Sequence, residues 1–138
     1  MKRMLIVLFL SLFSLSLFAP GYSVCYIKAD PGIHHDPILR AFMFVESSFR
    51  VDVVNYLGYS GILQIGAEMT AEANRINSLT GRAERYTFPA SALDSAQSVA
   101  IWYVAQNWHN PGYDVKRCAQ IWNPLASKKY LNKILKQL

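Results

Sequence analysis

The most constraining feature of the chain is an apolar segment that begins with a helix-start signal and ends at a single carboxylate. Asp36 is suited to cap a helix N-terminus, and Pro37 is suited to the first helical position. The residues that follow are apolar except for Arg40, which is typical of a buried helix. We therefore predict a buried helix over residues 37–48, with Glu46 near its C-terminal end.

The position of Glu46 predicts a carboxyl group that keeps its proton near neutral pH. Apolar neighbours disfavour the charged form, and the negative end of a helix disfavours it further. Both effects raise a carboxyl pKa, as a general acid requires. The alternative is a surface glutamate that ends the helix and pairs with an arginine, because structural ion pairs also occupy such positions.

A glycine-punctuated turn follows this helix. Gly58, Gly61 and Gln64 form a G-x-x-G-x-x-Q pattern, in which Gly61 permits a close backbone approach or a positive φ. A carboxylate at the end of a buried helix, followed by such a turn, indicates an active site.

The remaining pattern predicts an all-α single domain of five or six helices with an active-site cleft. Apolar periodicity indicates further helices over residues 62–76, 91–108, 114–122 and 127–138, separated by loops. Trp102 and Trp108 lie within the longest helix, and at helical spacing they favour core packing over stacking on sugars.

The N-terminal segment has the pattern of a secretory signal peptide. Lys2 and Arg3 precede an uncharged apolar run, which is followed by the small residues Gly21 and Ser23. We predict a signal peptide over residues 1–23 and export to the periplasm or cell envelope; an uncleaved anchor is the alternative.

The predicted mature domain, residues 24–138, carries a modest positive charge. Removing Lys2 and Arg3 leaves 12 basic against 9 acidic residues, a net charge of +3. This charge suits an anionic polymer such as cell-wall material or a membrane surface. Nucleic acid is not expected as a partner, because the sequence has no basic run or basic–aromatic pattern.

The two cysteines leave three interpretations open. In an exported chain Cys25 and Cys118 permit one disulfide, with two separate thiols as the alternative. A lipidated Cys25 is a third, although the preceding residues fit that pattern poorly. The spacing of His34, His35 and His109 predicts no metal site, and no cofactor is expected.

The motif around Glu46 resembles the lytic transglycosylase family with an SLT domain, within the lysozyme-like superfamily. That family has Glu-Ser at the end of a buried helix, followed by Gly-x-x-Gly-[Leu/Ile]-x-Gln-[Ile/Leu]. Here Glu46-Ser47 is followed by Gly58, Gly61 and Gln64 at offsets of 12, 15 and 18 residues from the glutamate. The resemblance covers essentially the whole mature domain and implies a lysozyme-like fold.

The chain departs from the family pattern at three places. Trp122-Asn123 stands where the family has Tyr-Asn, so the active-site hydroxyl is missing there. The family's Gly after this Asn is absent, since Pro124 and its neighbour occupy the stretch. The family's Pro after the Gln-Ile motif is also missing, because Gly66-Ala67 follows the motif here. Tyr130 corresponds to a family Tyr near the C-terminal helix.

The resemblance implies a reaction on peptidoglycan glycan strands. Glu46 would serve as the only general acid and base, cleaving between N-acetylmuramic acid and N-acetylglucosamine to leave a 1,6-anhydromuramic end. The implied substrate-binding residues are Gln64, Asn55, Asn123, Tyr130 and Ser47. Structural alternatives are a turn-closing amide for Gln64, a turn-former at Asn55, a helix stop at Asn123 and core packing for Tyr130.

Two other functions stay open. A hydrolytic muramidase would need a second carboxylate, and Asp52 and Asp94 are not obvious partners for Glu46. A secreted glycan-binding or assembly-associated protein with a degenerate site would explain Trp122. We expect a monomer, and a domain of this kind would suit association with a cell-envelope secretion or conjugation machine.

Overall fold

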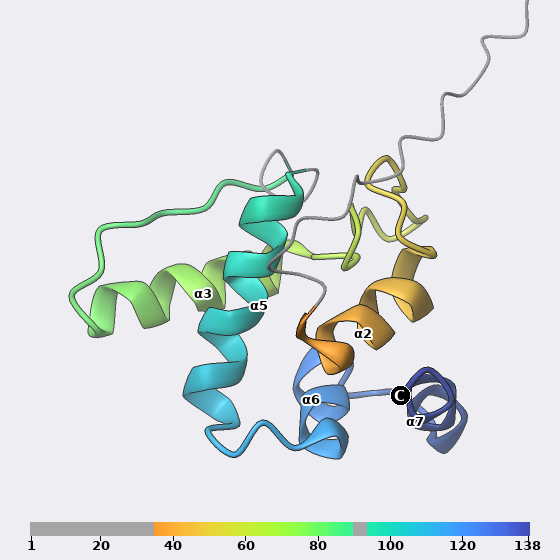
Figure 1. Cartoon of the computed structure of the whole chain (residues 1–138). Coiled ribbons are helices and arrows are strands. Elements are labelled where there is room, and N and C mark those ends of the chain that lie inside the picture. Colours follow the sequence, from red (N-terminus) through yellow and green to blue (C-terminus); the bar gives the residue numbers. More distant parts are fainter. Residues whose placement is uncertain (1–34, 90–93) are drawn as a thin grey trace, which may run out of the picture.

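The computed structural model describes residues 35–89 and 94–138, which form five α-helices (Figure 1). These ranges contain no strand, only isolated β-bridges, which confirms the all-α prediction. The predicted signal peptide, Cys25, His34 and the start of the predicted helix over 91–108 lie outside the described residues. The helices are α2 (Pro37–Ser47), α3 (Ala67–Leu79), α5 (Ser95–His109), α6 (Val115–Trp122) and α7 (Lys128–Leu135).

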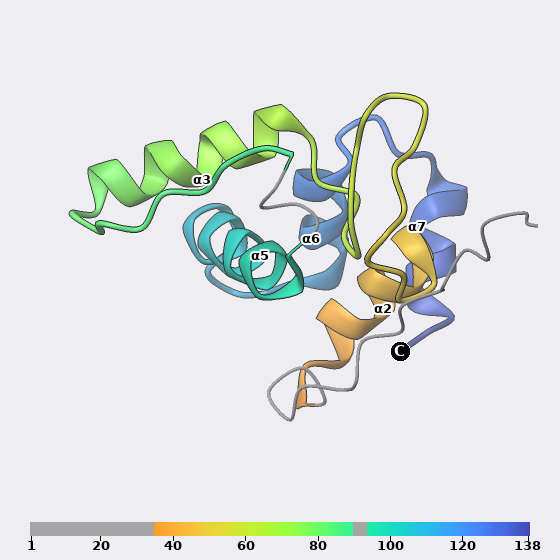
Figure 2. The same ribbon diagram turned by 90° about the horizontal axis from the view of Figure 1, so that it is seen from above.

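The helices pack in two pairs that are joined by α6. Helix α3 packs against α5, α2 packs against α7, and α6 contacts both α5 and α7. Figure 2 shows α5 end-on, with α3 running beside it and α7 on the opposite side of the molecule. Among these five helices, none combines the length and apolar character needed to cross a bilayer.

Aromatic rings join the pairs at the centre of the core. Trp102 of α5 is fully buried, and its ring centroid lies 4.7 Å from that of Phe42 of α2 and 4.8 Å from that of Trp122 of α6. Trp108 is 45% exposed, so the prediction of core packing is confirmed for Trp102 and wrong for Trp108.

Local sequence signals start the helices where they were expected. The Asp36 carboxylate accepts a hydrogen bond from the Leu39 N–H at 2.9 Å, and Pro37 is the first residue of α2. Asp114 caps α6 in the same way, accepting from the Arg117 N–H at 2.8 Å. Such caps satisfy N–H groups that have no partner within the helix.

The helix predicted over residues 62–76 is displaced, because α3 begins at Ala67 and ends at Leu79. Gly61 has φ +78° and Gln64 has φ +50°, a left-handed conformation that a right-handed helix cannot contain. The apolar side chains of this stretch are nevertheless buried from a turn: Ile62, Leu63 and Ile65. The last helix is also shorter than predicted, since α7 ends at Leu135.

Helix α2 is less completely buried than its composition predicted. Leu39, Ala41, Phe42 and Met43 face the core, whereas Phe44 is 42% exposed. The helix therefore has one solvent-facing edge, and Glu46 lies beyond its buried residues, in the last turn.

A polar cluster that the sequence did not predict fixes the N-terminal end of α2. The Tyr103 and Tyr113 hydroxyls each donate to Asp36 Oδ2 at 2.6 Å, while Oδ1 accepts the capping hydrogen bond. Trp102 Nε1 in turn donates to the Tyr113 hydroxyl at 2.9 Å. Burial, followed by the hydrogen bond to Asp36, raises the pKa of both tyrosines. One carboxylate thus links α2 to α5 and to the turn before α6.

Candidate active site

Ser47 fixes the end of α2 against the glycine-rich turn. Its hydroxyl lies 2.8 Å from the Ile62 carbonyl oxygen and accepts the Arg50 N–H at 3.1 Å. Ser48 caps the helix in a left-handed conformation, with φ 54°. These contacts give Ser47 a structural role, and its predicted contact with substrate stays a prediction.

Glu46 precedes Ser47 in the last turn of α2, and its carboxyl group contacts a tyrosine near the C-terminal end of the chain. The Tyr130 hydroxyl of α7 donates a short hydrogen bond to Glu46 Oε1. Burial raises the pKa of Glu46, and the Tyr130 hydrogen bond opposes part of that rise. The predicted direction of the pKa is therefore confirmed, and burial is its main cause. Within the described part of the chain, Glu46 makes no ion pair with an arginine, so the surface-pair alternative is not seen.

The glycine-rich turn is closed by Gln64. Its Nε2 donates to the Val53 carbonyl oxygen at 3.1 Å and to the Gly61 carbonyl oxygen at 2.9 Å. The Gly61 N–H also donates to the Val53 carbonyl oxygen, at 2.8 Å. Both amide hydrogens of Gln64 are thus engaged with the backbone, as its structural alternative predicted.

Asn55 shapes the tip of the preceding loop. Its Oδ1 accepts the Leu57 N–H at 2.8 Å and the Tyr59 N–H at 3.0 Å. Asn55 is therefore a turn-former, and no contact brings it to Glu46 among the described residues. The tip that it shapes carries Tyr56, which is 95% exposed.

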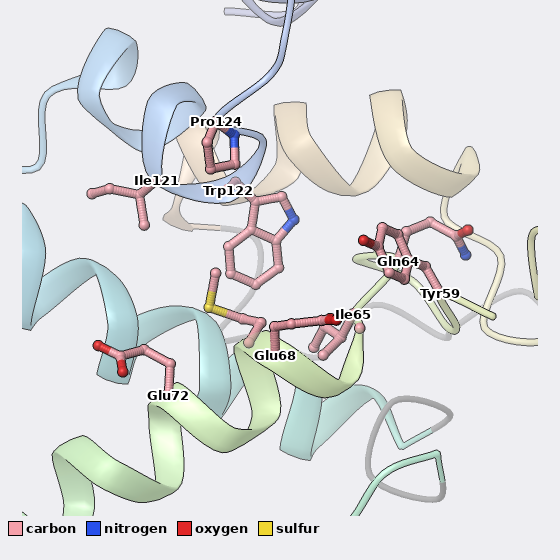
Figure 3. Close-up of a pocket in the computed structure, with 10 residues that line it drawn as sticks. Tyr59, Gln64, Ile65, Glu68, Glu72, Ile121, Trp122 and Pro124 are labelled. Carbon is pink, nitrogen blue, oxygen red and sulfur yellow. The ribbon is translucent and has the colours of Figure 1, made fainter. Parts of the chain in front are cut away.

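A cavity of about 300 Å³, here named the tryptophan cavity, lies between α3, α6 and the glycine-rich turn (Figure 3). Trp122 projects from α6 toward α3, and its Nε1 donates to the Leu63 carbonyl oxygen at 3.0 Å. Tyr59 and Gln64 lie at one end of the cavity and Glu72 at the other. Of the lining residues, sequence analysis named Gln64, Gly66, Trp122 and Pro124; the polar and aromatic residues that it missed are Tyr59, Glu68 and Glu72.

Gly66 allows a close approach between the backbone and the Tyr59 ring. A β-carbon at this position would lie 2.6 Å from Cε1 of Tyr59, closer than atoms can pack. The absence of a side chain therefore allows the Tyr59 ring to lie against the backbone and form one wall of the tryptophan cavity.

A second cavity of about 310 Å³, here named the lysine cavity, lies between α6 and α7. Tyr130 and Asn123 line it, with Lys116 and Lys128 at its edges. Asn123 ends α6, donating its N–H to the Ala119 carbonyl oxygen at 2.9 Å. Tyr130 connects this cavity to Glu46, which is not among the residues that line either cavity.

The carboxylates weighed as partners for Glu46 have other roles. Asp52 lies 3.7 Å from Arg50 Nε, and Asp94 caps α5 by accepting the Ala96 N–H at 2.9 Å. Both are exposed, and neither contacts Glu46.

Glu72 is a third carboxylate, and it faces both the tryptophan cavity and the surface. Arg75 donates two hydrogen bonds of 2.7 Å to it, and His109 Nε2 lies 2.7 Å from its Oε1. The Arg75 hydrogen bonds are the main cause that lowers the pKa of Glu72 to about 2. Glu72 is therefore ionised across the neutral range.

The remaining predictions concern metals and cysteines. Among residues 35–89 and 94–138, no three side chains of the metal-binding types come together. Cys118 is buried, its Sγ lies 3.3 Å from Asn110 Nδ2, and burial raises the pKa of its thiol to about 11. Because Cys25 lies outside the described residues, the Cys25–Cys118 disulfide stays a prediction.

The chain matches no protein-family model, no curated protein and no solved structure. The resemblance to the SLT family therefore stays a prediction from the motif residues.

Proposed function

We propose that the protein is an exported peptidoglycan lytic transglycosylase with a lysozyme-like arrangement of helices around Glu46. The observation that carries the proposal is the pairing of a partly buried Glu46 with Tyr130 in the last turn of α2. Burial raises the pKa of Glu46, which favours the protonated form that a general acid must supply. The fixed tyrosine donor leaves the other carboxyl oxygen, Oε2, as the one that would carry and deliver the proton.

In the first step Glu46 would protonate the glycosidic oxygen between N-acetylmuramic acid and N-acetylglucosamine. The C1–O bond breaks, the leaving sugar departs with the proton as an alcohol, and positive charge develops at the muramic anomeric carbon. The substrate's own N-acetyl oxygen stabilises that charge. Tyr130 would stabilise the glutamate, which is now ionised, because its hydroxyl is already directed at Oε1.

In the second step the 6-hydroxyl of the muramic residue attacks its own anomeric carbon. Its proton passes to the ionised Glu46, which acts as base and returns to its starting state. The product is a 1,6-anhydromuramic end, and no water is consumed. One carboxyl group performs both transfers, which agrees with the other roles found for Asp52 and Asp94.

The tryptophan cavity is our proposed binding region for the glycan. Its apolar walls include Trp122 and Tyr59, and aromatic rings pack against the faces of sugar rings. Gln64 lines the same cavity, and its amide oxygen accepts no hydrogen bond from the described residues, so it is available to a sugar hydroxyl. Asn123 and Tyr130 lie on the other side of the segment that carries Trp122, in the lysine cavity.

A hydrolytic muramidase is the second candidate, and Glu72 is the observation that favours it. Hydrolysis needs an ionised second carboxylate to act as nucleophile or to activate water. Glu72 lines the tryptophan cavity and is ionised across the neutral range. We rank it second because both Glu72 oxygens are already engaged by Arg75 and His109.

The two chemistries leave different ends on the glycan. The full-length chain and its Glu46→Gln variant would each be incubated with peptidoglycan sacculi, and the products separated and weighed by mass spectrometry. We expect 1,6-anhydromuramic ends from the parent and none from the variant. Reducing ends would indicate hydrolysis. Absence of products with sacculus binding retained in both proteins would overturn the enzymatic proposal in favour of a glycan-binding protein.

A further inference from the structure

We propose that the lysine cavity is a subsite for a carboxylate of the peptide stem that peptidoglycan carries on its muramic acid residues. The inference rests on the proposed function for the identity of the polymer. The cavity itself, however, is defined by its own lining, which shares only Pro124 with the lining of the tryptophan cavity.

The charge of this cavity comes from two helices. Lys116 belongs to α6 and Lys128 to α7, and both line the same cavity of about 310 Å³. No acidic residue lines it, and within the described ranges neither lysine forms an ion pair. Two ammonium groups beside one cavity repel each other, and an anion placed between them removes that repulsion.

Three of the uncharged lining residues can donate hydrogen bonds to a carboxylate, whereas Ala119, Pro124, Ala126 and Leu131 are apolar. Gln120, Asn123 and Ser127 offer amide and hydroxyl donors around the two lysines. Ser127 precedes α7 and its side chain makes no capping hydrogen bond, so its hydroxyl is not committed to the helix. The tryptophan cavity contrasts with this one, because Glu68 and Glu72 line it. The two cavities therefore differ in the sign of the charge that they favour.

The position of the lysine cavity relative to the acid points to the ligand. Tyr130 is one of the residues that line the cavity, and its hydroxyl donates to Glu46, so a single residue borders both sites. In peptidoglycan the peptide stem is attached to the same muramic residue whose glycosidic bond is cut. A stem carboxylate in the lysine cavity would thus fix the muramic residue close to Glu46.

Binding and cleavage can be tested separately. In the Glu46→Gln background, which removes the acid, the full-length chain would be titrated with a soluble N-acetylmuramyl peptide that has free carboxylates. The same peptide with its carboxylates amidated is the neutral control. We expect Lys116→Gln and Lys128→Gln each to raise the Kd for the free acid by about threefold to fivefold, the range that single exposed charge pairs provide. Added salt should weaken binding of the free acid and leave the amidated peptide unaffected.

Lys133→Gln is the matched control. It makes the same charge change on α7, but Lys133 lines a separate hollow formed by α7 alone. We expect Lys133→Gln, made in the Glu46→Gln background, to leave the Kd for the free-acid peptide unchanged. Circular dichroism melting would show that all three lysine variants keep the fold.

The outcomes separate this inference from the proposed function. Equal affinity for the free and amidated peptides, or equal losses in the Lys116, Lys128 and Lys133 variants, would overturn the subsite even if the parent cleaves sacculi. Selective loss in the Lys116 and Lys128 variants would support the subsite even if the parent leaves sacculi intact. In a cleaving parent, the same two variants should slow cleavage of peptide-bearing strands and leave cleavage of peptide-free strands unchanged.

Discussion

The two ends of helix α2 carry the same chemical group in opposite settings. At the N-terminal end, Asp36 accepts hydrogen bonds from one backbone N–H and two tyrosine hydroxyls. At the C-terminal end, Glu46 accepts one, from Tyr130. The helix N-terminus carries partial positive charge that stabilises an anion, whereas the C-terminus carries partial negative charge that opposes one. One helix therefore holds a structural carboxylate and a candidate proton donor.

The difference teaches that the number of hydrogen-bond donors decides what a buried carboxyl group is suited to do. Three hydrogen-bond donors and the helix N-terminus stabilise the Asp36 carboxylate. Both of its oxygens are engaged, so neither is free for chemistry. A single donor leaves Glu46 only partly compensated for its burial, and its pKa is raised as a result. The ionised form of Glu46 is thus incompletely stabilised, and this makes the carboxyl group suited to proton transfer.

The largest expected effect is on cleavage by the Glu46→Gln variant. Loss of a general acid typically slows the reaction by about 10²- to 10⁴-fold, because no other group delivers the proton. The rate of release of glycan fragments from sacculi measures the effect. Asp36→Asn is the control at the other end of α2, and its cleavage rate should stay near that of the parent. Equal losses in the two variants would remove the functional distinction between the ends.

The Asp36→Ala variant should show the largest loss of stability. It removes a helix cap, at about 1 kcal/mol, and leaves two partly buried hydroxyls without their acceptor. We expect the free energy of unfolding to fall by about 2–4 kcal/mol, as measured by urea denaturation. Asp114→Ala removes a cap that has no tyrosine partners and should cost only about 1 kcal/mol. Similar losses in the two variants would show that the tyrosines contribute nothing at Asp36.

The Tyr130→Phe variant tests the comparison by removing the one hydrogen-bond donor that Glu46 has among the described residues. The Tyr130 hydrogen bond lowers the pKa of Glu46, so its removal should raise that pKa further. Cleavage depends on protonated Glu46 and is lost as pH rises through its pKa, so the alkaline limb of the pH profile should move to higher pH. The maximal rate should fall by about tenfold, since a charge-assisted hydrogen bond to the acid is lost. An unchanged profile would mean that Tyr130 does not act on the acid.

The thermal stability of the Glu46→Gln variant tests whether the ionised Glu46 carboxylate is destabilised in the folded protein. The folded pKa of Glu46 lies above its unfolded value, so ionisation in the folded state costs free energy. This cost is absent below the unfolded value of 4.5 and grows as pH rises toward the folded pKa. Glutamine avoids it, so the variant should melt at a higher temperature than the parent at neutral pH and at the same temperature near pH 4. Destabilisation at neutral pH would contradict this.

The smallest effect is expected at Glu72, a partly exposed carboxylate whose two oxygens are both paired. Its folded pKa of about 2 lies below the unfolded value of 4.5, so its stabilising contribution is present above pH 4.5 and is lost as pH falls toward 2. Glu72→Gln should lower the free energy of unfolding by less than about 1 kcal/mol at neutral pH, because solvent screens the pairs. High salt should reduce the difference, as measured by thermal melts. A loss as large as that of Asp36→Ala would contradict the partly exposed setting.

The features that sequence analysis predicted are those encoded within a few residues. Asp36-Pro37 and Asp114 are complete helix-start signals on their own, and both begin helices. The left-handed conformation of Gln64 has no such signal, because apolar neighbours at helical spacing also fit a helix. The start of α3 was therefore placed too early. The fates of Trp102 and Trp108 follow from helix geometry, since six residues turn a helix by about 240° and place the two rings on different faces.

The features that could not be predicted depend on partners distant in the sequence. Asp36 was interpreted only as a cap, although its second oxygen binds tyrosines 67 and 77 residues later. Glu46 was predicted as an acid from its own helix, but its donor lies 84 residues away. Tyr130 was placed near the site only through the resemblance to the SLT family. Tertiary packing selects such partners, and local sequence does not encode them.

The distance along the chain between Glu46 and Tyr130 has a consequence for the timing of folding. Contacts between residues so far apart in sequence form late, because the intervening chain must first be ordered. Helix α7 is the last helix of the chain, and its docking on α2 brings Tyr130 to the acid. Until then Glu46 has neither its burial nor its donor. The Glu46–Tyr130 pair would therefore form late in folding, once α7 has docked on α2.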